Sequence, residues 1–173
     1  MEYFFGMQIQ QTTEGISICQ AKYIEDMLKR FIMQNCKPMS TLVVGSKLMK
    51  DYESPLCDDT LYRSLIGCLM YLTSTRPETV FDVSLVARFM HQPYKSNWLA
   101  SKRILKYVSS TKFYGLFYTF ANDSNVVAYT DVDCAGILDD RKSASRYDFL
   151  FGGNLVSWSN KNQPTVALSI VEA

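Results

Sequence analysis

The sequence predicts an α+β fold in which a β-hairpin and a group of helices precede a strand-rich segment. Three observations support this prediction. Apolar residues recur at helical spacing between residues 20 and 112. From residue 115 onward, short aromatic and β-branched segments are separated by turn residues. Hydrophobic residues make up 47 % of the 173 residues, which is enough to build a packed core.

The chain is expected to begin with a hairpin and a first helix. Two short apolar segments, 3–10 and 16–19, are separated by polar residues and Gly15, which is a turn pattern. The period then changes, and residues 20–33 place an apolar stripe on one helical face before Pro38 closes the unit. This stripe consists of Tyr23, Ile24, Met27, Leu28 and Phe31.

Three more helices are predicted before residue 112. The first begins near Asp58 and Asp59, either of which can cap it. The second has Pro77 at its first position, where a missing N–H costs nothing. Ser96 is predicted to cap the third helix. All three carry apolar residues at helical spacing, so these stripes are expected to form the core rather than a cofactor site.

Strands are expected in the second part of the chain. Residues 126–131 are a strand candidate, and residues 147–151 and 155–159 flank Gly152 and Gly153 in a hairpin pattern. A last helix is expected from about residue 165, so the sequence reads as one that starts in a strand and stops within a helix.

Charge and cysteine content exclude several classes of protein. The formal net charge is +1, so any surface that binds nucleic acid has to be local. The five cysteines are odd in number and none has CxxC spacing, which argues against a disulfide framework or a zinc site. Reduced thiols, no apolar run of membrane-spanning length and no secretory signal together predict an intracellular protein, cytoplasmic or nuclear.

Asp131 is the first candidate for chemistry. It ends an apolar strand, and Asp133 follows two residues later. Carboxylates in such positions can hold a divalent metal ion, although two-metal hydrolysis of a phosphodiester needs several that converge from separate elements. The alternative is that both aspartates only end the strand and shape a turn. The residues alone favour this alternative.

A basic group on the last predicted helix is the second candidate. Lys102, Arg103 and Lys106 share one face of this helix, where they could contact nucleic-acid phosphates. The alternative is an ordinary solvated face, which the spacing alone favours. His91 is the only histidine and has no catalytic partner near it in the sequence, so it is expected to end a helix.

Several long motifs resemble one family in their order along the chain. They are YFFGMQIQ at residues 3–10, ICQAKYIEDML at 18–28, YRSLIGCLMYLTSTRP at 62–77 and YTDVDCAG at 129–136. This series resembles the Pol polyproteins of copia-type LTR retrotransposons and covers essentially the whole chain. It implies the C-terminal part of a reverse transcriptase followed by the N-terminal part of a ribonuclease H.

The resemblance also implies a division of the chain. Residues 1–115 would be a thumb/connection-like region with a β-hairpin and helices, and residues 116–173 would be a truncated ribonuclease H-like domain with an incomplete sheet. The family's polymerase aspartates would lie upstream of Tyr3 and are absent from this sequence.

The resemblance assigns a role to Asp131, which matches the first metal-binding aspartate of the ribonuclease H family. Asp131 is therefore the expected catalytic and metal-binding residue, with Mg²⁺ as the ion. The remaining carboxylates would lie beyond residue 173, so the site would be incomplete. Arg146 stands where the family has glycine, and we expect it to hinder a tight turn there. Asp148 occupies a position that is normally apolar.

The expected function is that of a fragment of a retrotransposon reverse transcriptase and ribonuclease H, catalytically inactive by itself. In the parent polyprotein its partner would be an RNA–DNA hybrid or template–primer duplex, with Lys102, Arg103 and Lys106 on the phosphate backbone. One alternative is a non-catalytic nucleic-acid-binding module. Another is a domesticated protein-interaction fragment, which could self-associate through the open sheet. No membrane is expected among its partners.

Overall fold

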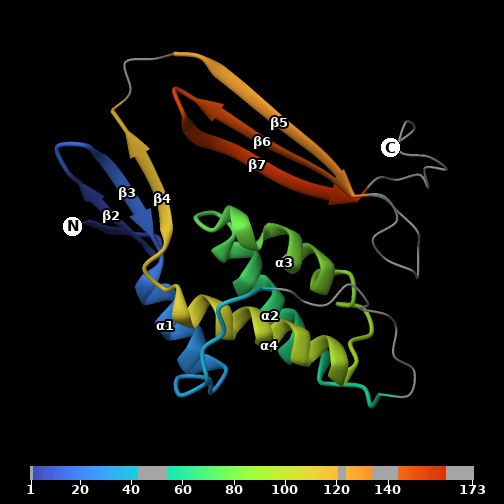
Figure 1. Cartoon of the computed structure of the whole chain (residues 1–173). Coiled ribbons are helices and arrows are strands. Elements are labelled where there is room, and N and C mark those ends of the chain that lie inside the picture. Colours follow the sequence, from blue (N-terminus) through green and yellow to red (C-terminus); the bar gives the residue numbers. More distant parts are fainter. Residues whose placement is uncertain (1, 43–53, 121–123, 134–143, 163–173) are drawn as a thin grey trace.

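A computed structural model describes residues 2–42, 54–120, 124–133 and 144–162. Within these residues the chain forms four α-helices, one short 3-10 helix and two antiparallel sheets (Figure 1). The helices lie between the strands β1–β3 and the strands β4–β7 in the sequence. The predicted α+β class is confirmed.

The first sheet has the strand order β1-β2-β3-β4. Its strands are β1 (Glu2–Phe4), β2 (Met7–Gln11), β3 (Gly15–Cys19) and β4 (Gly115–Thr119). The predicted single segment 3–10 is two strands, because Phe5 and Gly6 form a tight turn with φ values of 47° and 79°. Two consecutive positive φ values are typical of the two-residue hairpin turn that matches strand twist. The hydroxyl of Tyr71 donates a hydrogen bond to the Phe5 carbonyl and holds this turn against the helices.

The helices are α1 (Ala21–Arg30), α2 (Asp59–Leu72), α3 (Val80–Ala87) and α4 (Lys95–Ser110), and the 3-10 helix Pro77–Thr79 leads into α3. Asp58 caps α2 as predicted, since its side chain accepts a hydrogen bond of 2.9 Å from the Leu61 N–H. The predicted Ser96 cap is wrong. Helix α4 begins at Lys95, and its N-cap is Tyr94, two residues before Ser96; the Tyr94 N–H donates to the Asn97 side chain at 2.9 Å.

The core lies among the four helices. Apolar residues of α1, α2, α3 and α4 contribute to one cluster of buried side chains. Fully buried members include Ile24, Leu65, Ile66, Leu69, Leu72, Val86, Ile104, Leu105 and Val108. Tyr62 joins this cluster with its hydroxyl donating to the Val86 carbonyl at 2.7 Å, and burial raises the pKa of this phenol to about 12. The helices therefore form one packed unit, as their predicted apolar stripes require.

The second sheet has the order β5-β6-β7. Its strands are β5 (Val126–Asp133), β6 (Ala144–Phe151) and β7 (Asn154–Asn162). The predicted hairpin at Gly152 and Gly153 is confirmed, with φ values of 54° and 76°. The helix predicted from about residue 165 lies outside the described residues.

The second sheet packs against the helices through β7, the strand that lies closest to them in Figure 1. The Trp158 indole N–H donates to the Thr73 carbonyl at the end of α2, over 3.1 Å. Asn154 joins the two sheets, because its side chain accepts from the Thr119 N–H at 2.8 Å and donates to the Thr119 carbonyl at 3.1 Å. One face of β5–β7 is thus turned toward the helices.

None of the described helices is long and apolar enough to cross a membrane.

Candidate nucleic-acid interface and metal position

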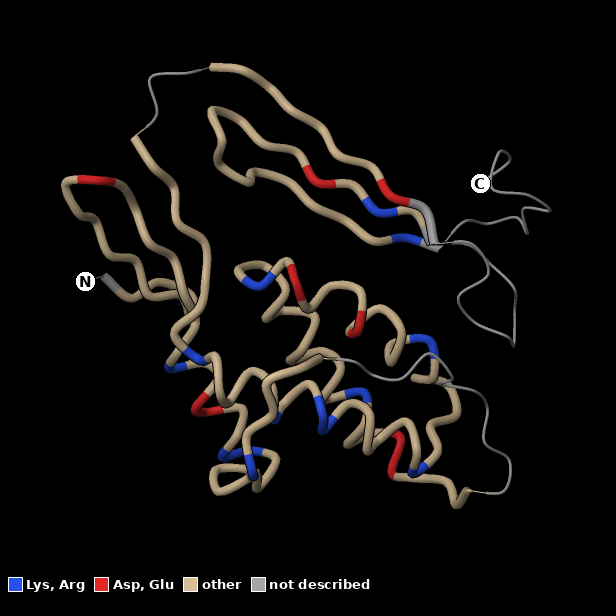
Figure 2. The backbone as a smooth tube through the Cα atoms, viewed as in Figure 1, with Lys and Arg blue, Asp and Glu red and all other residues tan. Residues whose placement is uncertain are grey.

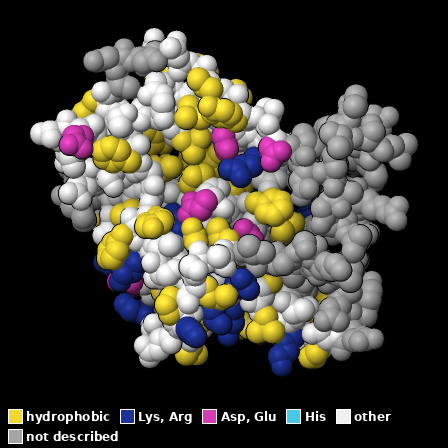
Figure 3. Space-filling view, viewed as in Figure 1, with side chains coloured by type: hydrophobic (Ala, Val, Ile, Leu, Met, Phe, Trp, Pro, Cys, Tyr) yellow, Lys and Arg dark blue, Asp and Glu magenta, His cyan; other side chains and the backbone are white. Residues whose placement is uncertain are grey.

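Helix α4 presents the predicted basic residues on the side away from the core. Ile104, Leu105 and Val108 are fully buried, whereas Lys102 and Lys106 are partly exposed and stand one helical turn apart. Figure 2 shows that basic positions are spread along α1 and α4, and Figure 3 shows basic side chains gathered over the helical part of the face in view. The fold therefore concentrates positive charge on its helices despite the near-neutral total.

The three basic side chains of α4 differ in how far they are already engaged. Arg103 donates from Nη2 to the Thr41 hydroxyl at 3.3 Å, so its guanidinium is tied to the preceding loop. The Lys102 ammonium lies 5.1 Å from the centre of the Trp98 ring, which is a cation–π contact, and the residue is partly exposed. Within the described residues the Lys106 ammonium has no ion-pair partner. Lys102 and Lys106 are thus the side chains of this group best placed to meet a phosphate.

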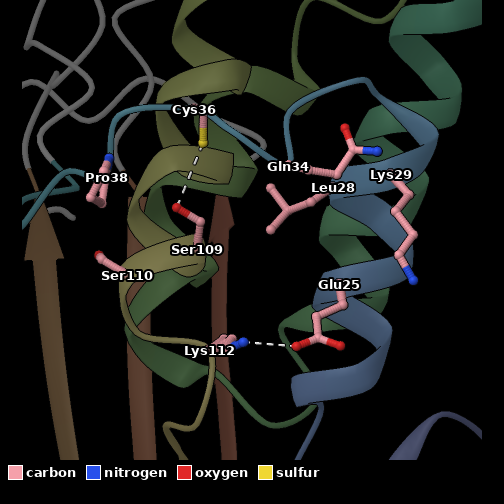
Figure 4. Close-up of a pocket in the computed structure, with 9 residues that line it drawn as sticks. All are labelled: Glu25, Leu28, Lys29, Gln34, Cys36, Pro38, Ser109, Ser110 and Lys112. Atoms are coloured by element: carbon pink, nitrogen blue, oxygen red, sulfur yellow. Dashed lines mark hydrogen bonds and ion pairs between the residues drawn. The ribbon is translucent and has the colours of Figure 1, made fainter.

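A cavity of about 560 Å³ opens beside the end of α4 (Figure 4). Its walls come from α1, from the loop after α1 and from the last turn of α4, and they include Leu28, Cys36 and Ser109. Ser109 and Ser110, which line the cavity, lie one helical turn beyond Lys106 on the same side of α4. The cavity therefore adjoins the side of α4 that carries Lys102 and Lys106.

An ion pair closes one end of this cavity. The Lys112 ammonium lies 2.7 Å from a Glu25 carboxylate oxygen, and their side chains are 35 % and 46 % exposed. The hydrogen bond from Lys112, followed by its charge, lowers the pKa of the Glu25 carboxyl. The pair joins α1 to the chain that leaves α4. Lys29 adds a second cation to the cavity wall, so the cavity carries more positive than negative charge.

Asp131 lies on β5, which is an edge strand of the second sheet within the described residues, and its side chain is exposed. Its partner in the ladder between β5 and β6 is Arg146. Among the described residues no group of three histidine, cysteine, aspartate or glutamate side chains could hold a metal ion. The structure does not bring Asp131 together with Lys102, Arg103 or Lys106, which lie on α4.

The described residues around Asp131 do not fit a Mg²⁺ site. Mg²⁺ requires near-octahedral coordination by oxygen atoms, and two-metal hydrolysis requires several carboxylates around the ions. Asp131 instead has a cationic side chain as its cross-strand neighbour, on the same face of the sheet. The side chain of Asp133, the other candidate near this position, lies outside the part of the chain that the structure describes.

The expectation that Arg146 would hinder a tight turn is wrong. Arg146 lies within β6 and is paired on both sides, with Asp131 of β5 and Asn160 of β7. Its guanidinium forms an ion pair with Asp148 at 3.1 Å, which accounts for a carboxylate at this otherwise apolar position. The alternation of Arg146 and Asp148 two residues apart is the signal in the sequence that could have placed them on one face.

Arg76 is a further charged residue whose role the sequence did not reveal. Its side chain is fully buried in the turn between α2 and the 3-10 helix, where Nε contacts Glu78 at 2.6 Å. Both terminal nitrogens donate to Thr111, to the carbonyl oxygen at 3.0 Å and to the hydroxyl at 2.6 Å. Arg76 therefore joins the turn after α2 to the end of α4 and belongs to the framework rather than to the basic surface.

Comparison with known proteins gives the class of this chain. No protein-family model matches it, and no solved structure matches it. An alignment of 186 positions shows 39 % identity to the retrovirus-related Pol polyprotein from transposon TNT 1-94 of Nicotiana tabacum. This alignment covers 99 % of the present chain and 14 % of that protein. The chain is 35 % identical over 174 residues to the Pol polyprotein from transposon RE2 of Arabidopsis thaliana, covering 100 % of this chain and 12 % of that protein. Both relatives are Pol polyproteins of transposons, and the chain aligns with one segment of each.

A shorter relative is matched over most of its own length. An uncharacterized mitochondrial protein of Arabidopsis thaliana is 37 % identical over 172 residues, which is 99 % of this chain and 72 % of that protein. The chain belongs to the family of copia-type retrotransposon Pol polyproteins. It spans only 12 to 14 % of the length of the Pol polyproteins themselves.

Proposed function

We propose that this chain corresponds to the junction between the reverse transcriptase and the ribonuclease H of a Pol polyprotein. Residues 1–115 are assigned to a thumb/connection-like region, and residues 116–173 to a truncated ribonuclease H-like domain. The separation of the strands into two sheets supports a division of the chain near this point. Strand β4 (Gly115–Thr119) pairs with β3 in the first sheet, so the sheets themselves divide after Thr119 rather than at residue 115. An intracellular location, cytoplasmic or nuclear, agrees with this assignment.

The role proposed for the chain is to hold an RNA–DNA hybrid or template–primer duplex by its phosphate backbone. One observation carries this role: Lys102 and Lys106 are partly exposed and stand one turn apart on one side of α4, with the Lys102 ammonium above the Trp98 ring. Contacts of this type position a duplex and do not read its sequence. Arg103, tied to Thr41, is proposed as a weaker contributor.

We further propose that the chain does not hydrolyse the hybrid by itself. In the parent polyprotein Asp131 would be a catalytic and metal-binding residue, and Mg²⁺ would supply the activated water and charge neutralisation. One carboxylate beside an arginine does not supply the converging ligands that this chemistry requires. The chain would then act as a binding module without catalysis.

Replacing Lys102 and Lys106 together by glutamate is expected to weaken hybrid binding by at least about tenfold at low salt, because two phosphate contacts become repulsive. The dependence of log affinity on log salt concentration should also become shallower, by roughly 0.9 for each lost contact on a B-form duplex. Fluorescence anisotropy of a labelled RNA–DNA hybrid, titrated with the full chain at several salt concentrations, measures both quantities.

The matched control is Lys22→Glu with Lys161→Glu, which changes charge equally at exposed positions in α1 and β7 rather than in α4. It should leave affinity close to that of the unmodified chain. Equal losses in both double variants, or no binding even at low salt, would exclude the proposed interface. With Mg²⁺ present the labelled RNA should remain intact, and cleavage that disappears in Asp131→Asn would contradict the proposed lack of catalysis.

Self-association is a second candidate use of the chain, favoured by one feature of β5. Within the described residues β5 is paired on one side only, and it exposes Val126 and Tyr129, at 69 % and 61 %. An apolar, unpaired edge strand is a template for another strand. Sedimentation equilibrium of the purified chain decides this point, because a monomer across the accessible concentration range excludes pairing through β5.

A further inference from the structure

The cavity beside the end of α4 lies between two helices and is bordered at two ends by side-chain contacts. At one end the Cys36 thiol donates to the Ser109 hydroxyl over 3.7 Å. At the other end the Lys112 ammonium contacts the Glu25 carboxylate at 2.7 Å. Figure 4 shows both contacts and, between them, Leu28 pointing from α1 toward the end of α4. A volume of about 560 Å³ falls in the range of pockets that bind small molecules, so one nucleotide can be accommodated.

The walls of the cavity combine apolar groups with hydrogen-bond acceptors. Leu28 is buried, and Pro38 adds a second apolar side chain. The hydroxyls of Ser109 and Ser110 both donate to backbone carbonyls at 2.8 Å, so their oxygens are left as acceptors for a ligand. An apolar wall with acceptors at its border suits a flat ring that carries N–H groups on its edge.

The charged groups of the cavity favour the same kind of ligand over a bare anion. Lys29 is paired with Asp26 at 3.5 Å, and Lys112 is paired with Glu25. The hydrogen bond from Lys112 lowers the pKa of the Glu25 carboxyl, so this group is ionised and acts only as an acceptor. A carboxylate binds best to two N–H groups side by side.

The nucleobases differ in how well they match this carboxylate. Guanine carries a ring N–H and an amino group next to each other on one edge, which is the pair of donors that a carboxylate prefers. Uracil carries one N–H between two carbonyl oxygens, and these oxygens repel a carboxylate. The Glu25 carboxylate at the border of the cavity therefore selects guanine over uracil.

We propose that the cavity binds the guanine of an unpaired nucleotide at the end of a hybrid that lies along α4. The cavity adjoins the side of α4 that carries Lys102 and Lys106. From Lys102 to Ser110 the helix rises roughly 12 Å, at 1.5 Å per residue. A duplex strand rises about 3.4 Å per nucleotide, so this length matches the last few base pairs before the strand end. The inference rests on the proposed function, because the α4 lysines hold the duplex.

The alternative is that the space between the helices holds only water. An unpaired nucleotide would then leave the affinity of a hybrid unchanged, whichever base it carries. The two accounts therefore differ in the gain from a single unpaired nucleotide and in the dependence of that gain on the base.

The test compares a blunt RNA–DNA hybrid with hybrids that carry one unpaired guanosine or uridine at the 5′ or the 3′ end of the RNA. Fluorescence anisotropy with the full chain gives each dissociation constant. Guanosine at one of the two ends is expected to tighten binding about fivefold relative to the blunt hybrid, which is the size of one net hydrogen bond. Uridine at that end should give little gain.

Glu25→Gln should remove the preference for guanosine over uridine. The Glu25 side chain is 46 % exposed, so this change should leave the fold intact. Asp26→Asn is the matched control, because it removes the same charge from the next residue of α1, where the side chain is 57 % exposed. Asp26 does not line the cavity, so this variant should keep the preference.

A second variant blocks the cavity without changing its charge. Gln34 is exposed and lines the cavity, and Gln34→Trp adds a side chain large enough to occupy part of it. This variant should lose the gain from the unpaired guanosine. The midpoint of thermal unfolding shows that it is folded.

The proposal is overturned if guanosine gives no gain at either end, if uridine gives an equal gain, or if the preference survives Glu25→Gln. Guanosine monophosphate, titrated alone, separates a free nucleotide from a strand end. If it binds while an unpaired guanosine gives no gain, the cavity serves free nucleotides and the proposal fails. A blunt hybrid that does not bind contradicts the interface on α4 instead, so failures of the two proposals give different results.

Discussion

Replacing Arg76 by alanine is expected to lower the free energy of unfolding by about 3 kcal/mol, because a large buried side chain is lost together with hydrogen bonds from a charged donor to Thr111. Arg76 is the largest fully buried side chain among the described residues. Its guanidinium contacts Glu78 and Thr111 and lies 5.7 and 5.8 Å from the ring centres of Tyr107 and Tyr114. Its removal leaves the Thr111 carbonyl without this donor and opens a cavity between two aromatic rings.

Urea denaturation followed by circular dichroism measures this change, provided that the m-value stays constant. Arg63→Ala is the matched control, since Arg63 forms an ion pair with Asp59 at 2.7 Å in which both side chains are 51 % exposed. That variant should lose about 1 kcal/mol or less. Arg76→Lys should lie between the two, because lysine keeps the charge but not the planar set of donors. A stability of Arg76→Ala equal to that of Arg63→Ala would show that the buried network does not hold the helices together.

Alanine at Gly115 is expected to destabilise the chain by about 1 to 3 kcal/mol, because it forces overpacking at the pairing of β3 with β4. Gly115 is paired with Cys19, and a Cβ at Gly115 would lie 2.1 Å from the Ile18 carbonyl oxygen. At the other end of the same ladder, a Cβ at Gly15 would lie 2.2 Å from the Tyr118 carbonyl oxygen. Backbone oxygens cannot move away without separating the strands, so Gly15→Ala should have a similar effect.

Gly67→Ala serves as a control, because its expected effect on stability is opposite in sign to those of Gly115→Ala and Gly15→Ala. Gly67 is exposed in α2, and a Cβ there would meet no atom within 4 Å. Gly67→Ala should therefore stabilise the chain by about 0.5 to 1 kcal/mol through helix propensity alone. The midpoints of thermal unfolding of the three alanine variants give the comparison. A rise in stability for Gly115→Ala would mean that β3 and β4 are not paired in solution as they are in the structure.

The framework residues and the candidate interface are separate parts of the molecule. Arg76 and the two glycines hold α4 and β4 in place, whereas Lys102 and Lys106 lie on the outer side of α4. Destabilising changes at Arg76 should reduce hybrid binding only where the chain unfolds. Charge changes at Lys102 and Lys106 should reduce binding with little effect on stability. This separation allows folding and binding to be measured as independent properties.

Local rules explain the elements that the sequence determined by itself. The Asp58 cap, the first-turn Pro77 and the Gly152–Gly153 turn each depend on neighbours within a few residues, and all three are found where they were predicted. Helical periodicity likewise identified the buried stripes of α1, α2 and α4, because the residues of one stripe are brought together by the helix itself. The order of motifs identified the family.

Tertiary contacts decided the rest, since their partners are far apart along the chain. Phe5 adopts a positive φ in a turn held by Tyr71, and β4 pairs with β3 across the whole helical region. The buried position of Arg76 depends on Thr111, which no local pattern connects to it. Arg146 became the neighbour of Asp131 only through strand register. A period of two or 3.6 residues fixes which side chains share a face, but pairing and packing between distant segments determine what each face meets.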